Sequence, residues 1–168
     1  GNNEQEQAAA PADIIFTQIS TGLQHTCAVS EMNQLFCWGD DLYGRTTPPA
    51  GEFVQVSAGH YHNCAIDADG FLQCWGDNYY GQSSPPSGAF VAVDVGWNHS
   101  CGINIWGAIE CWGYDQFEQA RPPAGKYMQI SAGQLHTCAV EESGETRCWG
   151  DNHYGQLDLV AGSYQQVS

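Results

Sequence analysis

Eight cysteines recur with a single period along the 168-residue chain. The two cysteines of each pair lie ten residues apart, and both members of the pair recur every 37 residues. A fixed period of this length marks a repeat protein built from similar supersecondary units. We therefore expect four tandem units. Paired cysteines at such regular spacing are also typical of disulfide-bonded extracellular domains, so the pattern predicts an oxidising compartment.

The chain is strongly acidic, with four Lys plus Arg against nineteen Asp plus Glu and a formal net charge of −15. Such a charge repels phosphate backbones and anionic lipids, so nucleic-acid binding is not expected. No stretch approaches the roughly 18 to 20 apolar residues that a membrane span needs, and membrane insertion is not expected either. The sequence begins at Gly1 without a signal-peptide pattern, which fits a mature secreted chain or a fragment.

Each unit begins with a short strand. Residues 53–57 and 127–131 alternate between apolar and polar side chains, the period of two expected of a half-buried strand. The same register recurs at 16–20, 90–94 and 164–168. No segment shows helical periodicity, so the units are expected to consist of strands and turns.

The segment between the two cysteines of a unit is predicted to be a β-hairpin. Six residues after each first cysteine stands a residue that readily adopts positive φ in a tight turn: Asn33, Gly70, Gly107 or Gly144. The two cysteines then lie across from each other at disulfide distance. The simplest scheme pairs Cys27 with Cys37, Cys64 with Cys74, Cys101 with Cys111 and Cys138 with Cys148. One other regular scheme joins the second cysteine of each unit to the first of the next, leaving Cys27 and Cys148 over.

Two motifs carry a family resemblance. They are Ala-Gly-x-x-His-Thr-Cys-Ala-Val and Cys-Trp-Gly-Asp-Asn-x-Tyr-Gly-Gln, which in their fullest form stand at 132–140 and 148–156. Over residues 16–168 the sequence resembles the repeats of the regulator of chromosome condensation family, in the short cysteine-bearing form of secreted or surface proteins. The resemblance implies that each repeat forms a blade of antiparallel strands, and the family's full form is a seven-bladed propeller. The family's better-known activities are nucleotide exchange on a small GTPase with chromatin binding, and inhibition of β-lactamases by a secreted propeller.

The expected fold class is therefore all-β, with four tandem 37-residue β-propeller-type repeats, each carrying a disulfide-stapled hairpin. The repeats form either an open array or a ring completed by oligomerisation. Residues 1–13 have the composition of a linker and are expected as a flexible arm, or as an arm ordered against a neighbouring subunit. The repeat domain then covers 14–168, with units at about 16–52, 53–89, 90–126 and 127–163 and the start of a fifth strand at 164–168.

The ends of the array suggest self-association. Open repeat arrays need polar caps, and unpaired strand edges recruit further strands. We expect the C-terminal edge of one molecule to dock on the N-terminal edge of the next, in a head-to-tail contact that closes a ring or extends a filament. The candidate interface residues are Ile14, Ile15, Phe16, Leu157, Leu159, Val160 and Tyr164.

Two residue types recur beside the cysteines. A histidine stands two residues before each first cysteine, either as a buried hydrogen-bonding group or as a zinc ligand: His25, His62, His99 and His136. A tryptophan follows each second cysteine, and we expect it to pack in the core in preference to stacking on a sugar: Trp38, Trp75, Trp112 and Trp149. Four aromatic residues outside this register are predicted to be exposed contacts: Trp97, Trp106, Tyr61 and Tyr79.

The loop after each second cysteine is rich in oxygen ligands. These residues are expected as turn formers, with calcium binding as the alternative: Asp40, Asp41, Asp77, Asn78, Asp115, Asp151 and Asn152. Asn98 opens an Asn-x-Ser sequon and is a glycosylation candidate. No other metal and no cofactor are expected.

No nucleophile motif, phosphate loop or singled-out carboxylate pair is visible, so we do not expect an enzyme. A hydrolase would need a pocket residue such as Trp97, Trp106 or His153. The sequence favours a secreted or surface structural protein that associates with itself end to end, as a subunit of an extracellular fibre. The alternative is a secreted binding or inhibitor module that uses loop aromatics to hold a glycan or another surface protein.

Overall fold

The computed structural model describes residues 3–158 and contains four three-stranded antiparallel sheets. Each sheet is built from three consecutive strands and forms one blade, so blade 1 is β1–β3, blade 2 β4–β6, blade 3 β7–β9 and blade 4 β10–β12. A short 3-10 helix, η1, spans Leu42–Gly44. The strands are β1 Phe16–Thr21, β2 His25–Ser30, β3 Leu35–Gly39, β4 Phe53–Ala58, β5 His62–Asp67, β6 Leu72–Gly76, β7 Phe90–Val95, β8 His99–Asn104, β9 Ile109–Gly113, β10 Tyr127–Ala132, β11 His136–Glu141 and β12 Thr146–Gly150.

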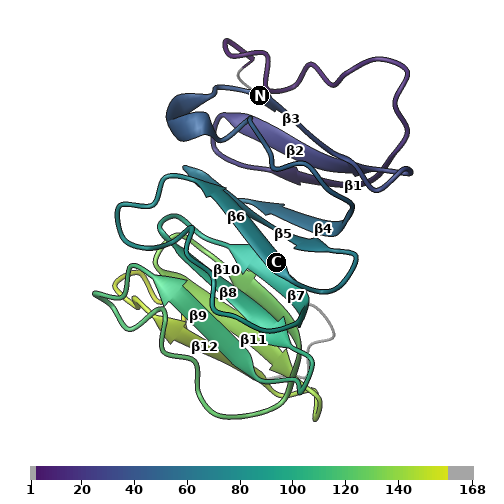
Figure 1. Ribbon diagram of the computed structural model, residues 1–168. Helices are drawn as coiled ribbons and strands as arrows, with labels where there is room; N and C mark the ends of the chain where they lie inside the picture. The colour runs from purple at the N-terminus through teal and green to yellow at the C-terminus, as the bar shows by residue number, and fades with distance from the viewer. Residues whose placement is uncertain (1–2, 159–168) are drawn as a thin grey trace.

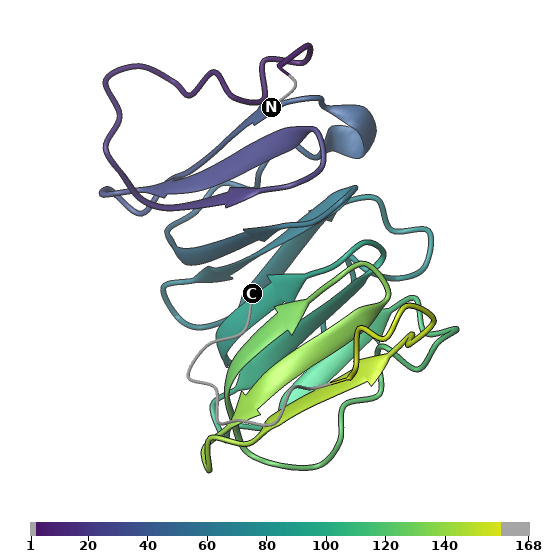
Figure 2. The same ribbon diagram turned by 180° about the vertical axis from the view of Figure 1, so that it is seen from behind.

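The blades follow one another in chain order as an open stack, with blade 1 and blade 4 at opposite ends (Figure 1; Figure 2). The expected fold class is confirmed: the chain is all-β, it has four repeat units, and the described sheets do not close into a ring. The fifth strand expected at 164–168 lies outside the described residues. No helix in the described part of the chain is both long and apolar enough to cross a membrane.

The predicted hairpins and their disulfides are confirmed. The turn residue has positive φ in every blade, from 59° at Asn33 to 90° at Gly70. Each pair of cysteines occupies directly opposite positions of its hairpin, with Cα atoms 4.0 to 4.1 Å apart. The bonds are Cys27–Cys37, Cys64–Cys74, Cys101–Cys111 and Cys138–Cys148.

The apolar core lies between blades. Each of its three clusters combines the disulfide of one blade with an aromatic residue that opens the next blade: Phe53, Phe90 or Tyr127, none more than 3% exposed. The following tryptophan joins the same cluster, at Trp75, Trp112 or Trp149. The expectation that these tryptophans pack in the core is therefore confirmed at the three internal interfaces. A three-stranded blade exposes an apolar face on its own, and stacking removes that face from water.

A buried backbone carbonyl ties each blade to the next. The Gln82 carbonyl accepts one hydrogen bond from Trp112 Nε1 at 2.8 Å and another from Ser100 Oγ at 3.2 Å. The Arg45 carbonyl receives the equivalent pair from blade 2, and the Gln119 carbonyl receives it from blade 4. We call this arrangement the carbonyl node. Because the donor from Asn63, Ser100 or Thr137 is fully buried and the tryptophan is buried or half-buried, each node satisfies polar groups that would otherwise be costly to desolvate.

The recurring histidines complete the nodes. His25 Nε2 lies 2.6 Å from Asn63 Oδ1, His62 Nε2 lies 2.7 Å from Ser100 Oγ, and His99 Nε2 lies 2.9 Å from Thr137 Oγ1. The two hydroxyls already donate to node carbonyls, so they accept from neutral imidazoles that carry the proton on Nε2. Because the neighbouring cysteines are in disulfides, they are not free to bind zinc. His25, His62 and His99 are structural hydrogen-bond donors, the first of the two roles considered from the sequence.

The first strands of neighbouring blades are joined through side chains. The backbone N–H of Ala58 donates to Ser20 Oγ at 3.0 Å, that of Val95 to Ser57 Oγ at 3.1 Å, and that of Ala132 to Asp94 Oδ2 at 2.7 Å. Ser57 Oγ also donates to Asp94 Oδ1 at 2.7 Å. Burial raises the pKa of Asp94. These bonds satisfy strand edges that have no backbone partner in the adjacent blade.

Residues 3–9 of the N-terminal segment, which composition indicates as a flexible arm, pack on blade 1. Thr26 Oγ1 donates to the Gln7 carbonyl at 2.8 Å, and the segment is held by turns from Glu6 N to Asn3 O and from Ala9 N to Glu6 O. Low apolar content hides this packing from the sequence, because the segment makes polar contacts and contributes no apolar side chain to the interface.

Replacing Ser100 by alanine tests the node. The substitution removes the acceptor of the His62 proton and one donor to the Gln82 carbonyl, in a site that is fully buried. We expect the free energy of unfolding to fall by about 2 kcal/mol, measured by urea denaturation with the disulfides intact. Ser87→Ala, at an exposed position, is the control and should change it by less than about 0.5 kcal/mol. Equal effects of the two substitutions would contradict the assignment.

Acid should weaken the nodes. Burial lowers the pKa of His62 to about 3 and that of His99 to about 4. Above pH 6.5 both the folded and the unfolded states hold neutral imidazoles; below it only the unfolded state gains protons, so stability falls until the folded pKa is reached. At pH 5 the cost is about 2 kcal/mol for each histidine.

His62→Gln isolates one part of this pH dependence. Its amide can still donate to Ser100 Oγ but does not titrate. We expect the loss of unfolding free energy between pH 7 and pH 5 to be about 2 kcal/mol smaller than in the wild type, measured by urea titrations at both values. An identical loss in both proteins would show that His62 does not contribute.

Candidate functional site

One side of the blade stack carries most of the exposed aromatic residues. Strands β2 and β3 are antiparallel, so the turn before β2 lies beside the loop after β3, and the same holds in every blade. We call this side of the stack the loop face. It consists of the turns 22–24, 59–61, 96–98 and 133–135 and the loops 40–46, 77–83, 114–120 and 151–157. The loops project together on the left of Figure 1.

A groove of about 440 Å3 runs along the loop face where the four turns meet. Its floor is a column of glycines, one from each Gly-x-x-His turn. A Cβ atom built on Gly22 would lie 2.3 Å from the Gly59 carbonyl oxygen, and Gly59 and Gly96 stand in the same relation to the next glycine. No larger residue fits there, so the spacing of the blades requires glycine.

The two residues that follow each glycine vary between blades, and the first of them lines the groove. In blade 2 they are His60 and Tyr61, and in blade 3 Trp97 and Asn98. The His60 and Trp97 rings meet edge to face with centroids 4.8 Å apart. His60 Nδ1 and Trp97 Nε1 are buried and have no hydrogen-bond partner among the described residues. Burial, and then the charge of Arg45, lower the pKa of His60, so its ring is neutral near pH 7. The wall of the groove thus contains two buried polar atoms, one of a neutral imidazole and one of an indole, that have no partner among the described residues.

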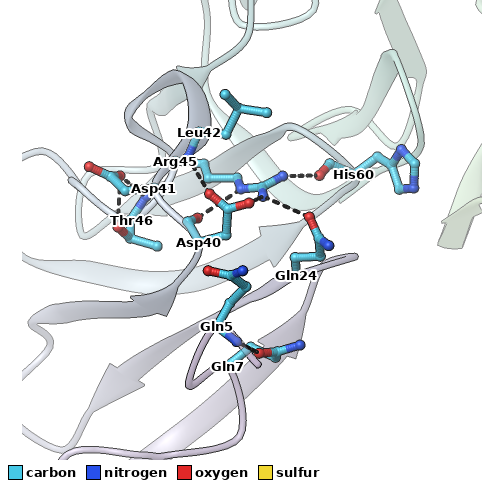
Figure 3. Close-up of polar contacts among 9 residues, drawn as sticks. All are labelled: Gln5, Gln7, Gln24, Asp40, Asp41, Leu42, Arg45, Thr46 and His60. Carbon is cyan, nitrogen blue, oxygen red and sulfur yellow. Dashed lines mark hydrogen bonds and ion pairs between the residues drawn. The ribbon is translucent and has the colours of Figure 1, made fainter. Parts of the chain in front are cut away.

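Arg45 fixes the turn that carries His60 (Figure 3). Its fully buried guanidinium pairs with Asp40 Oδ2 at 2.7 Å and donates to the Asp40 carbonyl at 2.8 Å. It also donates to the His60 carbonyl at 2.9 Å, across the boundary between blades 1 and 2. The guanidinium carbon lies 5.8 Å from the centre of the Tyr61 ring. Arg45 is therefore a positioning residue for the wall of the groove.

A second set of aromatic rings crosses the loops of blades 2 and 3. Tyr79 and Tyr80 meet edge to face at 4.8 Å, Tyr80 and Tyr114 at 4.8 Å, and Tyr114 and Phe117 at 6.4 Å. The Tyr114 hydroxyl donates to Gln116 Oε1. We call Tyr79, Tyr80, Tyr114 and Phe117 the aromatic ridge. Tyr79 is 82% exposed, so the ridge presents ring faces and edges to solvent.

The structure separates the four predicted contact residues. Trp97, Tyr61 and Tyr79 lie on the loop face, whereas Trp106 is 69% exposed in the β8–β9 turn on the opposite side of the stack. The glycosylation candidate Asn98 is half-buried in the turn before β8, and its carbonyl accepts from Tyr114 N at 2.8 Å. Glycosylation of Asn98 stays a prediction.

The acidic loop residues are engaged within their own loops. Asp41 accepts from Thr46, Asp77 from Gln82 Nε2, and Asp115 pairs with Arg121. The others act in the same way: Asn78 accepts from Ser83 N, Asp151 from Gln156 Nε2 and Asn152 from Leu157 N. In the described part of the chain, no group of three His, Cys, Asp or Glu side chains is arranged to hold a metal ion.

The predicted assembly residues fall in different places. Ile15 is 64% exposed, Ile14 is half-buried, and Phe16 packs on Phe36 and Trp38 of its own blade. Leu157 is half-buried in the loop after β12. Leu159, Val160 and Tyr164 lie outside the described residues.

Four aromatic or imidazole side chains of the groove and the aromatic ridge are not among the candidates from sequence: His60, Tyr80, Tyr114 and Phe117. His60 had no signal of its own, since its role depends on the neighbouring Trp97 turn. Tyr80 had one, because Tyr43, Phe117 and Tyr154 occupy the same position of their repeats, so an aromatic residue recurs in every loop.

Comparison with known proteins agrees with the fold. The ectodomain of the receptor kinase CR4 from Physcomitrella patens is 26% identical, with a TM-score of 0.77 over 92% of this chain and 46% of that one. The ectodomain of Arabidopsis thaliana ACR4 is 31% identical, with a TM-score of 0.68 over 82% and 51%. Prp20p from Saccharomyces cerevisiae, 16% identical, shares the fold with a TM-score of 0.79 over 92% and 49%. No curated protein matches the chain.

The chain thus spans about half the length of the solved structures that it matches. Four disulfides and the similarity to receptor ectodomains suggest an extracellular type of domain. The sequence profile of the regulator of chromosome condensation (RCC1) repeat matches residues 16–45, 53–82 and 129–156. With more than half of its residues in these matches and the blade structure that they predict, the chain belongs to the RCC1 repeat family.

Proposed function

We propose that the chain is an extracellular, non-enzymatic binding domain that holds its ligand on the loop face. The observation that carries the proposal is the contrast within the Gly-x-x-His turns. Glycine and histidine are the same in all four blades, whereas the two residues between them differ in each blade, and the first of the two lines the groove. A rigid frame with variable contact residues is the usual arrangement of a binding surface.

The chemistry of the face indicates the kind of ligand. Aromatic ring faces attract cations as well as apolar groups, and exposed carboxylates of Asp41 and Glu118 lie on the same loops. Of the few cationic side chains, Arg45 is fully buried. Because the whole chain carries a formal charge of −15, it attracts cationic partners and repels acidic ones. The proposal is therefore a partner protein segment with Lys or Arg side chains, with a neutral glycan as the alternative.

Selection from a peptide display library and a glycan array tests this assignment. We expect ligands selected with the wild-type chain to be basic peptides and to lose affinity about tenfold or more for Tyr80→Ala/Tyr114→Ala. Trp106→Ala, on the side of the stack opposite the loop face, is the matched control and should bind as the wild type does. Ligands that bind both variants equally well would exclude the loop face, and selection of glycans alone would favour the alternative.

End-to-end self-association is a second candidate function, favoured by a separate observation. Trp75, Trp112 and Trp149 each donate to a node carbonyl of the preceding blade, but Trp38 Nε1 of blade 1 is buried without a partner. At the other end of the stack, the His136 ring has no hydrogen-bond partner in the described chain, whereas the three equivalent histidines do. Among residues 3–158, one end of the stack thus lacks an acceptor for a buried indole N–H, and the other lacks a partner for an imidazole. In this function the chain would be a subunit of an extracellular ring or fibre.

A further inference from the structure

The N-terminal segment imitates a loop of the repeat. In blade 2, Ser83 N donates to Asn78 Oδ1 at 2.9 Å and Tyr80 N donates to Gln82 Oε1 at 2.8 Å. In the N-terminal segment, Ala8 N donates to Asn3 Oδ1 at 2.7 Å and Gln5 N donates to Gln7 Oε1 at 2.9 Å. Glu6 takes the positive φ of Gly81 in this alignment, at 57° and 80° respectively. We call residues 3–9 the surrogate loop.

The surrogate loop also sits where a preceding blade would place its loop. Thr26 Oγ1 donates to the Gln7 carbonyl at 2.8 Å, as Thr137 Oγ1 donates to the Gln119 carbonyl at 3.2 Å. A Cβ atom built on Gly39 would lie 3.0 Å from Gln7 Cβ, and one built on Gly150 would lie 3.1 Å from Gln119 Cβ. Blade 1 therefore has the docking face of an internal blade, which we call the upstream face and define by Thr26, Trp38 and Gly39.

The imitation is incomplete at one atom. At every internal interface the tryptophan and its neighbouring polar side chain share one carbonyl, but at the upstream face only Thr26 reaches Gln7, and Trp38 Nε1 stays buried without an acceptor. An unpaired buried N–H costs free energy. A real blade loop, placed as at the three internal nodes, would supply the missing acceptor.

Blade 4 carries a matching loop already in its docking conformation. Leu157 N donates to Asn152 Oδ1 at 2.8 Å, Tyr154 N donates to Gln156 Oε1 at 2.9 Å, and Gly155 has φ 77°. The Gln156 carbonyl corresponds to the Gln82 and Gln119 carbonyls that form internal nodes. His136 of the same blade corresponds to His99, which binds the threonine of the following blade.

We propose that the upstream face of blade 1 binds blade 4 of a second copy of this chain, and that the surrogate loop occupies the site until the second copy displaces it. In the complex, Thr26 and Trp38 donate to the Gln156 carbonyl of the second copy, and Thr26 Oγ1 accepts from its His136. The inference rests on the end-to-end association proposed above and adds the competing segment. Since one chain spans 46% to 51% of the solved propellers, two copies joined twice in this way make one closed ring of propeller size.

Sedimentation velocity over a concentration series tests the proposal with three variants of the full chain. Asn3→Ala/Gln7→Ala removes the two side-chain bonds that shape the surrogate loop, and we expect the dimer dissociation constant to fall about tenfold. Trp38→Phe removes a donor that is unpaired in the monomer, so it should weaken the dimer about fivefold without breaking a hydrogen bond of the monomer. Asn78→Ala is the control for Asn3, because it removes the same bond from an internal loop, and it should leave dimerisation as it is.

The outcomes separate the two proposals. A dimer that tightens with Asn3→Ala/Gln7→Ala and weakens with Trp38→Phe supports the displacement of the surrogate loop. A dimer that responds to neither variant overturns the displacement but leaves end-to-end association standing. A monomer at every concentration in all variants overturns both. Open polymers in place of dimers would overturn the closed ring.

Discussion

The carbonyl node is the contact on which the structure depends. Each blade has only three short strands, and the backbone hydrogen bonds within a blade do not satisfy the polar side chains on its two faces. At the node, an indole N–H and a polar side chain donate to one buried carbonyl, 2.8 to 3.0 Å from the indole nitrogen in the three internal copies, and a neutral imidazole of the preceding blade donates to the same polar side chain. Because these groups are desolvated together, a blade that is present without its neighbour leaves several of them unpaired. The node therefore sets the spacing of the blades and makes their stability cooperative.

That spacing in turn creates the groove. The glycine column exists because successive turns approach until a Cβ atom would collide with the next carbonyl. Once glycine and histidine fix the turn, the two residues between them can differ from blade to blade. Leu23 and Gln24, His60 and Tyr61, Trp97 and Asn98, and Gln134 and Leu135 show how different they are. Stability and recognition thus reside at different positions of the same short motif, which lets the contact surface change without loss of the fold.

Much of this architecture follows from the sequence because its determinants are local. The period of the cysteines gives the blades, and Asn33 or glycine six residues after a cysteine gives the hairpin and with it the disulfide. The groove could not be predicted in the same way, because the meeting of His60 and Trp97 depends on how two blades stack. The surrogate loop was missed for another reason: Asn3 and Gln7 match Asn78 and Gln82, but Glu6 replaces the glycine and no cysteine or tryptophan marks the register.

The upstream end of the stack shows what happens to a node when the neighbouring blade is missing. At the upstream end the polar side chain keeps its bond, since Thr26 needs only a single carbonyl in reach and residues 3–9 supply one. The indole does not, because it needs the same carbonyl at a position set by the strands of a complete blade. Trp38 packs on Phe16 of its own blade, with ring centroids 5.8 Å apart, as Trp112 packs on Phe90. A short segment can therefore cover the upstream face and shield its polar groups without reproducing the full interface. Residues 3–9 cover the upstream face but leave Trp38 Nε1 without an acceptor. A blade that places its loop carbonyl as the internal nodes do would gain the free energy of that additional hydrogen bond.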